Sequence, residues 1–141
     1  MALAYIRDGF VYGYSIGDSR IYWLHEGKLF RISKDHTLAM RKYEANIYTK
    51  EEAENSPDQH TLTLYLGIGD AEELTPEIYF PFRLFTGDKL LICSDGLYDM
   101  ASAEEITQTL VSSTNPANDL VALALKNGGG DNVTCIVLQL E

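Results

Sequence analysis

Positive charge is scarce in this sequence, and the scarcity excludes several classes of protein. Of its 141 residues, 11 are Lys or Arg and 21 are Asp or Glu, so the net charge is −10 at pH 7. An acidic field repels nucleic-acid phosphates and anionic lipids, so we expect no nucleic-acid binding and no membrane anchoring. No apolar run approaches the ~18 residues of a spanning helix, and no signal-peptide pattern begins the chain. The sequence predicts a soluble, cytoplasmic protein.

Cysteine is scarce as well. The two cysteines, Cys93 and Cys135, lie inside apolar runs, which is typical of reduced, buried side chains in a cytosolic protein. Two cysteines can form one disulfide, but not the framework that holds a small secreted domain together. With 11 Gly, 4 Pro and 45% hydrophobic residues, the composition is that of a globular protein rather than a disordered or fibrous one. The length predicts a single domain over residues 1–141.

Short apolar runs separated by turn residues fill the first part of the chain. The runs are rich in residues that favour strands, and the Asp8-Gly9 pair tolerates the positive φ angles of a two-residue hairpin turn. The pattern predicts four strands in a meander, over residues 3–6, 10–16, 21–24 and 29–32. Lys, Glu and Ala are frequent over residues 33–60, where Thr49 and Glu52 have the spacing of a capping box. We expect this segment to be a surface excursion with one short helix.

The second half of the chain reads as strands, two helices and a last strand. Apolar patterns predict strands over residues 62–66, 77–82 and 89–93. Ser102 and Glu105 form a capping box at the start of one helix, and Asn115 followed by Pro116 begins the next. A final strand is predicted over residues 133–140. This order predicts the α+β class, with antiparallel β-sheets that the helix pair covers on one side.

Four aspartates lie at the ends of predicted strands. Asp18 follows one strand, Asp95 and Asp99 follow another, and Asp131 precedes the last. Carboxylates in such positions are natural ligands for hard divalent cations such as Mg²⁺ and Mn²⁺. Asp95 and Asp99 are four residues apart, which places them on one side of a turn or short helix. Because each aspartate is also a suitable turn or cap residue, a shared metal site and four independent turns both stay open.

Taken in order, five segments resemble the successive motifs of the metal-dependent protein serine/threonine phosphatases of the PPM, or type-2C, family. These segments are residues 17–20 (GDSR), 35–36 (DH), 62–67 (LTLYLG), 88–99 (DKLLICSDGLYD) and 129–134 (GGDNVT). The resemblance implies a partial α-β-β-α sandwich with a dinuclear manganese or magnesium centre at one end. It also implies that residues 33–60 correspond to the flap of bacterial members, and we call them the flap.

The resemblance implies a role for each of the four aspartates. Asp95 and Asp131 would be ligands of one metal ion, and Asp18 with Asp99 would help to hold an additional, more weakly bound ion. The implied activity is hydrolysis of phosphoserine and phosphothreonine in a phosphoprotein substrate by a metal-activated water. No residue of the chain is therefore expected to act as a covalent nucleophile.

The resemblance covers only the C-terminal part of the family's catalytic domain. An early acidic ligand, an Asp-Gly-x-Gly-Gly-His segment that bridges both metals, and a phosphate-binding arginine have no counterpart in this sequence. We therefore expect the chain alone to be incomplete and inactive, and its open sheet edges to associate with an N-terminal half chain or with a second copy. The alternative is a non-catalytic binding or regulatory module of the same fold. A calcium-stabilised structural domain is a third possibility, which does not account for the motif order.

Overall fold

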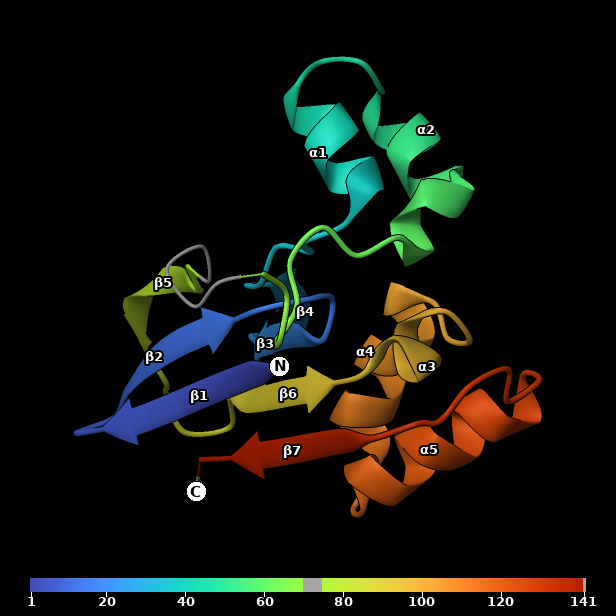
Figure 1. Cartoon of the computed structure of the whole chain (residues 1–141). Coiled ribbons are helices and arrows are strands. Elements are labelled where there is room, and N and C mark those ends of the chain that lie inside the picture. The colour runs from blue at the N-terminus through green and yellow to red at the C-terminus, as the bar shows by residue number, and fades with distance from the viewer. Residues whose placement is uncertain (70–74, 141) are drawn as a thin grey trace.

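A computed structural model describes residues 1–69 and 75–140; the other residues of the predicted 1–141 domain lie outside the described part. It contains two antiparallel sheets (Figure 1). The first sheet has the strand order β1-β2-β5, with β1 (Ala2–Arg7), β2 (Phe10–Ser15) and β5 (Glu77–Arg83). The second has the order β4-β3-β6-β7, with β3 (Arg20–His25), β4 (Lys28–Arg31), β6 (Lys89–Cys93) and β7 (Cys135–Gln139). The helices are α1 (Leu38–Glu44), α2 (Lys50–Asn55), η1 (Pro57–His60), α3 (Asp95–Tyr98), α4 (Ala103–Ser112) and α5 (Pro116–Lys126).

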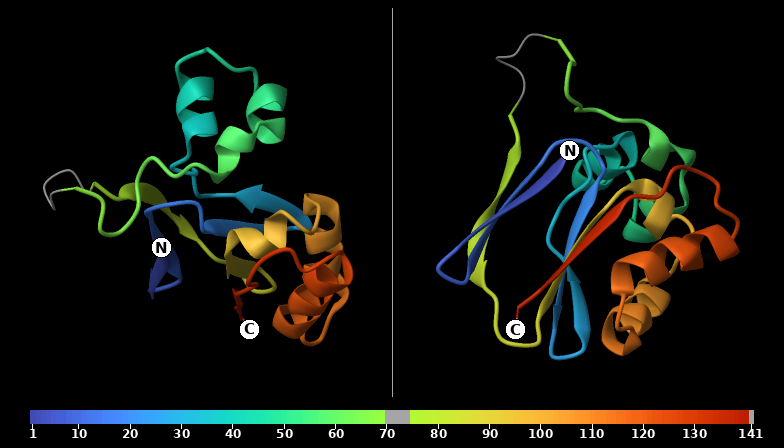
Figure 2. Two further views of the ribbon diagram at one scale, coloured as in Figure 1. Left: turned by 45° about the vertical axis from the view of Figure 1, so that its right-hand side comes forward. Right: turned by 90° about the horizontal axis from the view of Figure 1, so that it is seen from below.

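The four-stranded sheet lies in the middle of three layers (Figure 2, right). Successive side chains of a strand point to opposite faces, so β3 directs Ile21 toward the other sheet and Tyr22 toward the helices. The core between the sheets is built around Val11, Ile21, Leu84 and Leu90. The core under the helix pair contains Leu91, Leu97, Ile106, Leu110, Leu120 and Ala124. The predicted α+β class, with antiparallel sheets and a covering helix pair, is confirmed.

The first four strands form two hairpins rather than one meander. β1 pairs with β2 and β3 pairs with β4, but β2 and β3 belong to different sheets. The first hairpin turn has φ angles of 52° at Asp8 and 78° at Gly9, as the Asp-Gly pair predicts. Gly17 also has a positive φ, 93°, yet its N–H and C=O both bond to His36, and the chain crosses here between the sheets. The meander prediction was wrong because a turn signal does not specify which strands pair.

The strand predicted over residues 62–66 does not form. Only Leu62 pairs, in an isolated bridge with Thr37. Tyr65 and Leu66 are 45% and 56% exposed, so the apolar run does not contribute to the core. The prediction was wrong because an apolar run becomes a strand only where a neighbouring backbone is free to pair with it. The final strand is also shorter than expected, since β7 begins at Cys135.

The helix signals were more reliable. Both predicted capping boxes are present, from Thr49 to Glu52 at α2 and from Ser102 to Glu105 at α4. α5 begins with Pro116 as expected, although the Asn115 side chain makes no capping hydrogen bond. In the flap, α1 and η1 accompany the single helix that the sequence predicted.

Among the helices of residues 1–69 and 75–140, none is both long and apolar enough to cross a bilayer. Cys93 and Cys135 are free thiols, as expected, and they face each other across β6 and β7. Cys93 is buried, whereas Cys135 is only half-buried.

Candidate metal centre

The segment after β6 places two of the predicted ligands on one helical turn. Asp95 begins the one-turn helix α3, and Asp99 is its C-terminal cap. The Asp99 N–H donates to the Asp95 carbonyl at 2.9 Å, so the two residues lie on the same side of the turn, as predicted. The Asp95 carboxylate accepts a hydrogen bond of 2.9 Å from the N–H of Gly96, which fixes its orientation at the sheet end.

The turn that carries Asp131 is bonded to the start of α3. Ser94 N donates to Thr134 O at 3.0 Å, and Thr134 N donates to Ser94 Oγ at 3.1 Å. Gly96 has no side chain at the point of closest approach, where a Cβ atom would lie 2.4 Å from the carbonyl oxygen of Asn132. Asp131 itself is exposed, and its Oδ1 accepts the N–H of Asn132 at 2.6 Å. The Asp95 and Asp131 turns are therefore in direct backbone contact, although they are far apart in the sequence.

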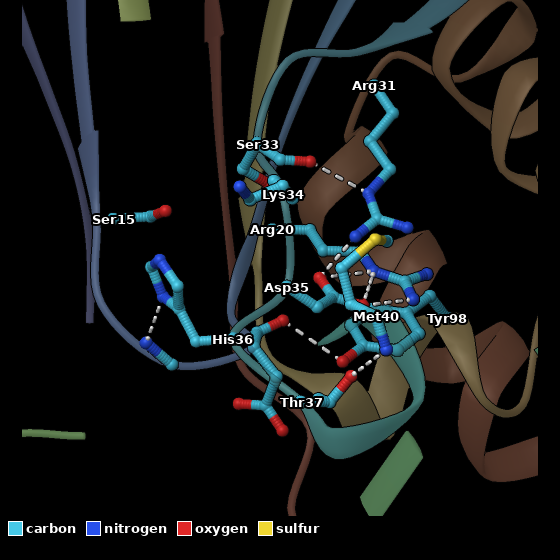
Figure 3. Close-up of polar contacts among 12 residues, drawn as sticks. Ser15, Arg20, Arg31, Ser33, Lys34, Asp35, His36, Thr37, Met40 and Tyr98 are labelled. Atoms are coloured by element: carbon cyan, nitrogen blue, oxygen red, sulfur yellow. Dashed lines mark hydrogen bonds and ion pairs between the residues drawn. The ribbon is translucent and has the colours of Figure 1, made fainter. Parts of the chain in front are cut away.

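Asp18 reaches the same end of the molecule from the crossover between the sheets. The hydroxyl of Tyr98, in α3, donates to the Asp18 carbonyl at 3.0 Å. On the other side, the N–H of Gly17 donates to His36 Nδ1 at 3.0 Å, and His36 N donates to the Gly17 carbonyl at 3.0 Å (Figure 3). These contacts connect the Asp18 turn to α3 and to the flap.

Asp18, Asp95 and Asp99 influence one another electrostatically. Burial raises the pKa of Asp18, and the Asp95 carboxylate raises it further. Burial also raises the pKa of Asp99. His60 opposes this rise, and its Nδ1 lies 3.8 Å from Asp99 Oδ2, whereas the Asp95 carboxylate raises the pKa of Asp99 further. Carboxylates that raise the pKa of Asp18 and Asp99 favour a cation among them, because a cation would stabilise the ionised forms.

Arg20 supplies positive charge close to these carboxylates. Its guanidinium binds the Asp35 carboxylate, with an Nη2 to Oδ2 distance of 2.7 Å, and lies 3.3 Å from the centre of the Tyr98 ring. Arg31 forms a second ion pair with Asp35 (Figure 3). Burial opposes the charge on Arg20, but the hydrogen bonds to Asp35 and the coulombic attraction of Tyr22, Asp35 and Tyr98 together outweigh burial and raise the pKa of Arg20. Arg20 is therefore held by Asp35 and Tyr98, where it acts as a fixed countercharge.

The structure thus brings three of the four predicted ligands into mutual electrostatic range and docks the turn of the fourth against α3. Within the described residues, no group of three or more His, Cys, Asp or Glu side chains is arranged to hold a metal ion by itself. The donors are all carboxylates, which suits hard cations such as Mg²⁺ and Mn²⁺. Sequence reasoning missed the roles of Gly96, Tyr98 and His36, because each depends on a contact with a segment distant in the chain.

The chain is similar to several known proteins, although no protein-family model matches it. It is 34% identical over 143 residues to a putative protein phosphatase 2C-type of Streptococcus pyogenes, covering 99% of this chain and 56% of that protein. The crystal structure of the Mycobacterium tuberculosis serine/threonine phosphatase PstP/Ppp matches with a TM-score of 0.88 and 33% identity, over 99% of this chain and 59% of that one. The catalytic domain of PstP in complex with 2 manganese ions matches with a TM-score of 0.79 and 32% identity, over 96% and 56%.

The chain belongs to the PPM, or type-2C, phosphatase family. It corresponds to the C-terminal part of the family's catalytic domain, as the motif order predicted. The chain spans about half or less of the length of the curated relatives that it matches.

Proposed function

We propose that the chain is part of a metal-dependent protein serine/threonine phosphatase, a hydrolase that acts on phosphoserine and phosphothreonine in phosphoproteins. The observation that carries the proposal is the convergence of Asp18, Asp95 and Asp99 at one end of the sheets, with the Asp131 turn bonded to α3. Relatives named serine/threonine phosphatases, and a PstP structure in complex with 2 manganese ions, support it.

The four carboxylates have distinct tasks in this proposal. Asp95 and Asp131 hold one Mn²⁺ or Mg²⁺ ion, and Asp18 with Asp99 holds a further, more weakly bound ion. Bound divalent cations would supply a nucleophilic water at neutral pH and stabilise negative charge on the phosphoryl oxygens. The chain's own contribution is to orient the carboxylates through backbone contacts, and no side chain has to form a covalent phosphoenzyme.

We further propose that this chain needs additional ligands, from the N-terminal half of a PPM catalytic domain, before it turns over substrate. The outer face of the first sheet supports such an association. Leu3, Tyr5, Ile78 and Phe80 are 44%, 53%, 68% and 95% exposed on β1 and β5. An apolar face of this kind marks an association surface. A second copy of the chain is the other partner that this face could accept.

The metal site is tested by thermal unfolding of the chain with and without Mn²⁺. We expect Mn²⁺ to raise the melting temperature, since a ligand that binds only the folded state stabilises it. Asp95→Asn combined with Asp131→Asn should abolish the increase. The matched control is Asp8→Asn combined with Glu104→Gln, which removes the same charge at exposed positions away from the site and should keep the increase. Absence of any Mn²⁺ effect on the parent chain would refute the metal site and favour a non-catalytic module of the same fold.

The need for a second half is tested separately by hydrolysis of p-nitrophenyl phosphate with Mn²⁺. We expect no turnover by the chain alone, and turnover after addition of the N-terminal half of a PPM catalytic domain. Activity of the chain alone that disappears with Asp131→Ala would disprove the need for a second half while supporting the metal site.

A further inference from the structure

A stem, made of residues 36–38 of the flap and residues 61–63, joins the flap helices to the rest of the molecule. An isolated β-bridge and a hydrogen bond of 2.8 Å from Thr63 N to His36 O hold the two sides of the stem together. The flap helices pack against one another above it (Figure 1). A cavity separates them from the end of the second sheet; the residues that line it include Arg20, Arg31, Met40, Lys50 and Gln59. The stem therefore contributes backbone contacts that hold the flap in position.

His36 connects this stem to the turn of Asp18. Its backbone N–H and its imidazole Nδ1 bond to the carbonyl and the N–H of Gly17, so both polar groups of Gly17 are held by one residue. Gly17 has φ of 93°, a left-handed conformation that a residue with a side chain rarely adopts. Because Asp18 follows directly, the two bonds determine where its carboxylate lies.

Asp35, which directly precedes the stem, reaches the other side of Asp18 through a chain of contacts. Asp35 binds the guanidinium of Arg20, which stacks on the Tyr98 ring, and the Tyr98 hydroxyl donates to the Asp18 carbonyl. The Asp35-His36 pair therefore holds the backbone on both sides of Asp18: His36 bonds to Gly17, and Asp35 acts through Arg20 and Tyr98. Figure 3 shows Asp35, His36, Arg20 and Tyr98.

We propose that His36 is a positioning residue for Asp18 and that it couples the flap to cation binding at this carboxylate. The proposal rests on the proposed function, in which Asp18 is a metal ligand. Coupling of this kind is reciprocal: a stem that orients Asp18 strengthens cation binding, and a bound cation in turn stabilises the stem and the flap. The flap would then respond to occupancy of the metal site without touching the ion.

The test compares His36→Ala with His36→Asn. Asn offers an amide oxygen close to the position of Nδ1, so it can accept the Gly17 N–H, whereas Ala cannot. We expect His36→Ala to weaken Mn²⁺ binding about 10- to 100-fold in calorimetry, the range for residues that orient metal ligands, and His36→Asn to stay near the wild-type affinity. Ile106→Val, a core change under the helix pair, controls for general loss of stability and should leave the affinity unchanged.

Hydrogen exchange supplies a readout that a merely stabilising residue would not change. In the wild-type chain and in His36→Asn, Mn²⁺ should slow amide exchange across residues 38–60. In His36→Ala this slowing should be clearly smaller, because only the contacts through Arg20 and through His60 then link the flap to the carboxylates. Equal Mn²⁺ affinity in His36→Ala and the wild type would overturn the inference while leaving the proposed function intact. If the wild type binds no Mn²⁺, the proposed function fails, and hydrogen exchange without metal then tests whether His36 positions Asp18. Faster exchange at residues 17–19 and 38–60 in His36→Ala than in His36→Asn would support the positioning role. Equal exchange in the two variants would refute it.

Discussion

Replacement of Gly96 by Ala tests how the two central turns of the site are held together. Gly96 lies in the first turn of α3, and it is not among the residues with positive φ, so helix propensity alone would favour Ala by about 1 kcal/mol. A Cβ atom, however, would lie 2.4 Å from the carbonyl oxygen and 3.0 Å from the carbonyl carbon of Asn132. Both are backbone atoms, which cannot rotate away. Propensity and close packing therefore predict opposite effects.

The distances decide which effect is larger. Ordinary contact begins at 3.4 Å, so the α3 turn and the Asn132 backbone would have to separate by about 1 Å. Overpacking of this kind costs about 1 to 3 kcal/mol, and a clash with backbone atoms belongs at the upper end of that range. After subtraction of the gain in helix propensity, we expect a net loss of up to about 2 kcal/mol in the free energy of unfolding. The same movement would lengthen the bonds between Ser94 and Thr134 and separate Asp95 from Asp131, so Mn²⁺ binding should weaken as well.

Urea denaturation of Gly96→Ala measures the stability change, and calorimetric titration measures the change in Mn²⁺ affinity. The matched control is Gly130→Ala, where the added Cβ would meet only the flexible end of Met100, at 3.3 Å. This control should be neutral or slightly stabilising, because Ala restricts the unfolded chain. If Gly96→Ala were as stable as Gly130→Ala, the close approach between α3 and the Asp131 turn would not contribute to the site as we argue.

Two further predictions concern groups away from the carboxylate cluster. Burial raises the pKa of Cys93 to about 12. Because the thiolate is the reactive form, iodoacetamide at pH 8 should label Cys93 only after the chain unfolds. Rapid labelling of Cys93 in the native chain, detected by mass spectrometry, would contradict this prediction. Burial would raise the pKa of Asp88, but hydrogen bonds from His25, the Phe85 N–H and Trp23 outweigh it and lower the pKa. The ionised Asp88 therefore adds stability at neutral pH, and this stability is lost as the pH falls below about 4. Urea denaturation at pH 3 and pH 7 should show a smaller difference in the free energy of unfolding for Asp88→Asn than for the parent chain.

Local signals in the sequence predicted the parts of the fold that depend on neighbouring residues. The capping box of Ser102 and Glu105 and the hairpin turn at Asp8 and Gly9 require only a few adjacent side chains, and both are present. Strand pairing depends on distant segments. For that reason residues 10–16 and 21–24 were predicted as neighbours in one meander, and residues 62–66 were assigned to a strand that has no partner beyond one bridge.

In the candidate site, too, the sequence predicted the local features and missed the contacts between distant segments. The spacing of Asp95 and Asp99 predicted their common side on a turn, because both lie within one short segment. Nothing in the spacing indicated that Tyr98 would bond to Asp18, 80 residues away in the sequence, or that a glycine at position 96 would allow the Asn132 backbone to approach. These contacts exist only after β3 and β6 pair, so they required the structure.

The contacts that orient the carboxylates involve the backbone at almost every step. Tyr98 and His36 bond to peptide groups on the two sides of Asp18, and Ser94 bonds to the backbone beside Asp131. The carboxylates of Asp95 and Asp131 also accept the N–H of the next residue, but the amide oxygen of Asn can accept the same bond. Replacement by Asn therefore keeps the bonds that shape each turn. Replacing Asp18, Asp95 or Asp131 by Asn should consequently reduce Mn²⁺ binding much more than it reduces the stability of the metal-free chain, whereas changes at Gly96 should reduce both. That contrast separates a site whose geometry is imposed by the fold from one that its ligands assemble only when an ion is bound.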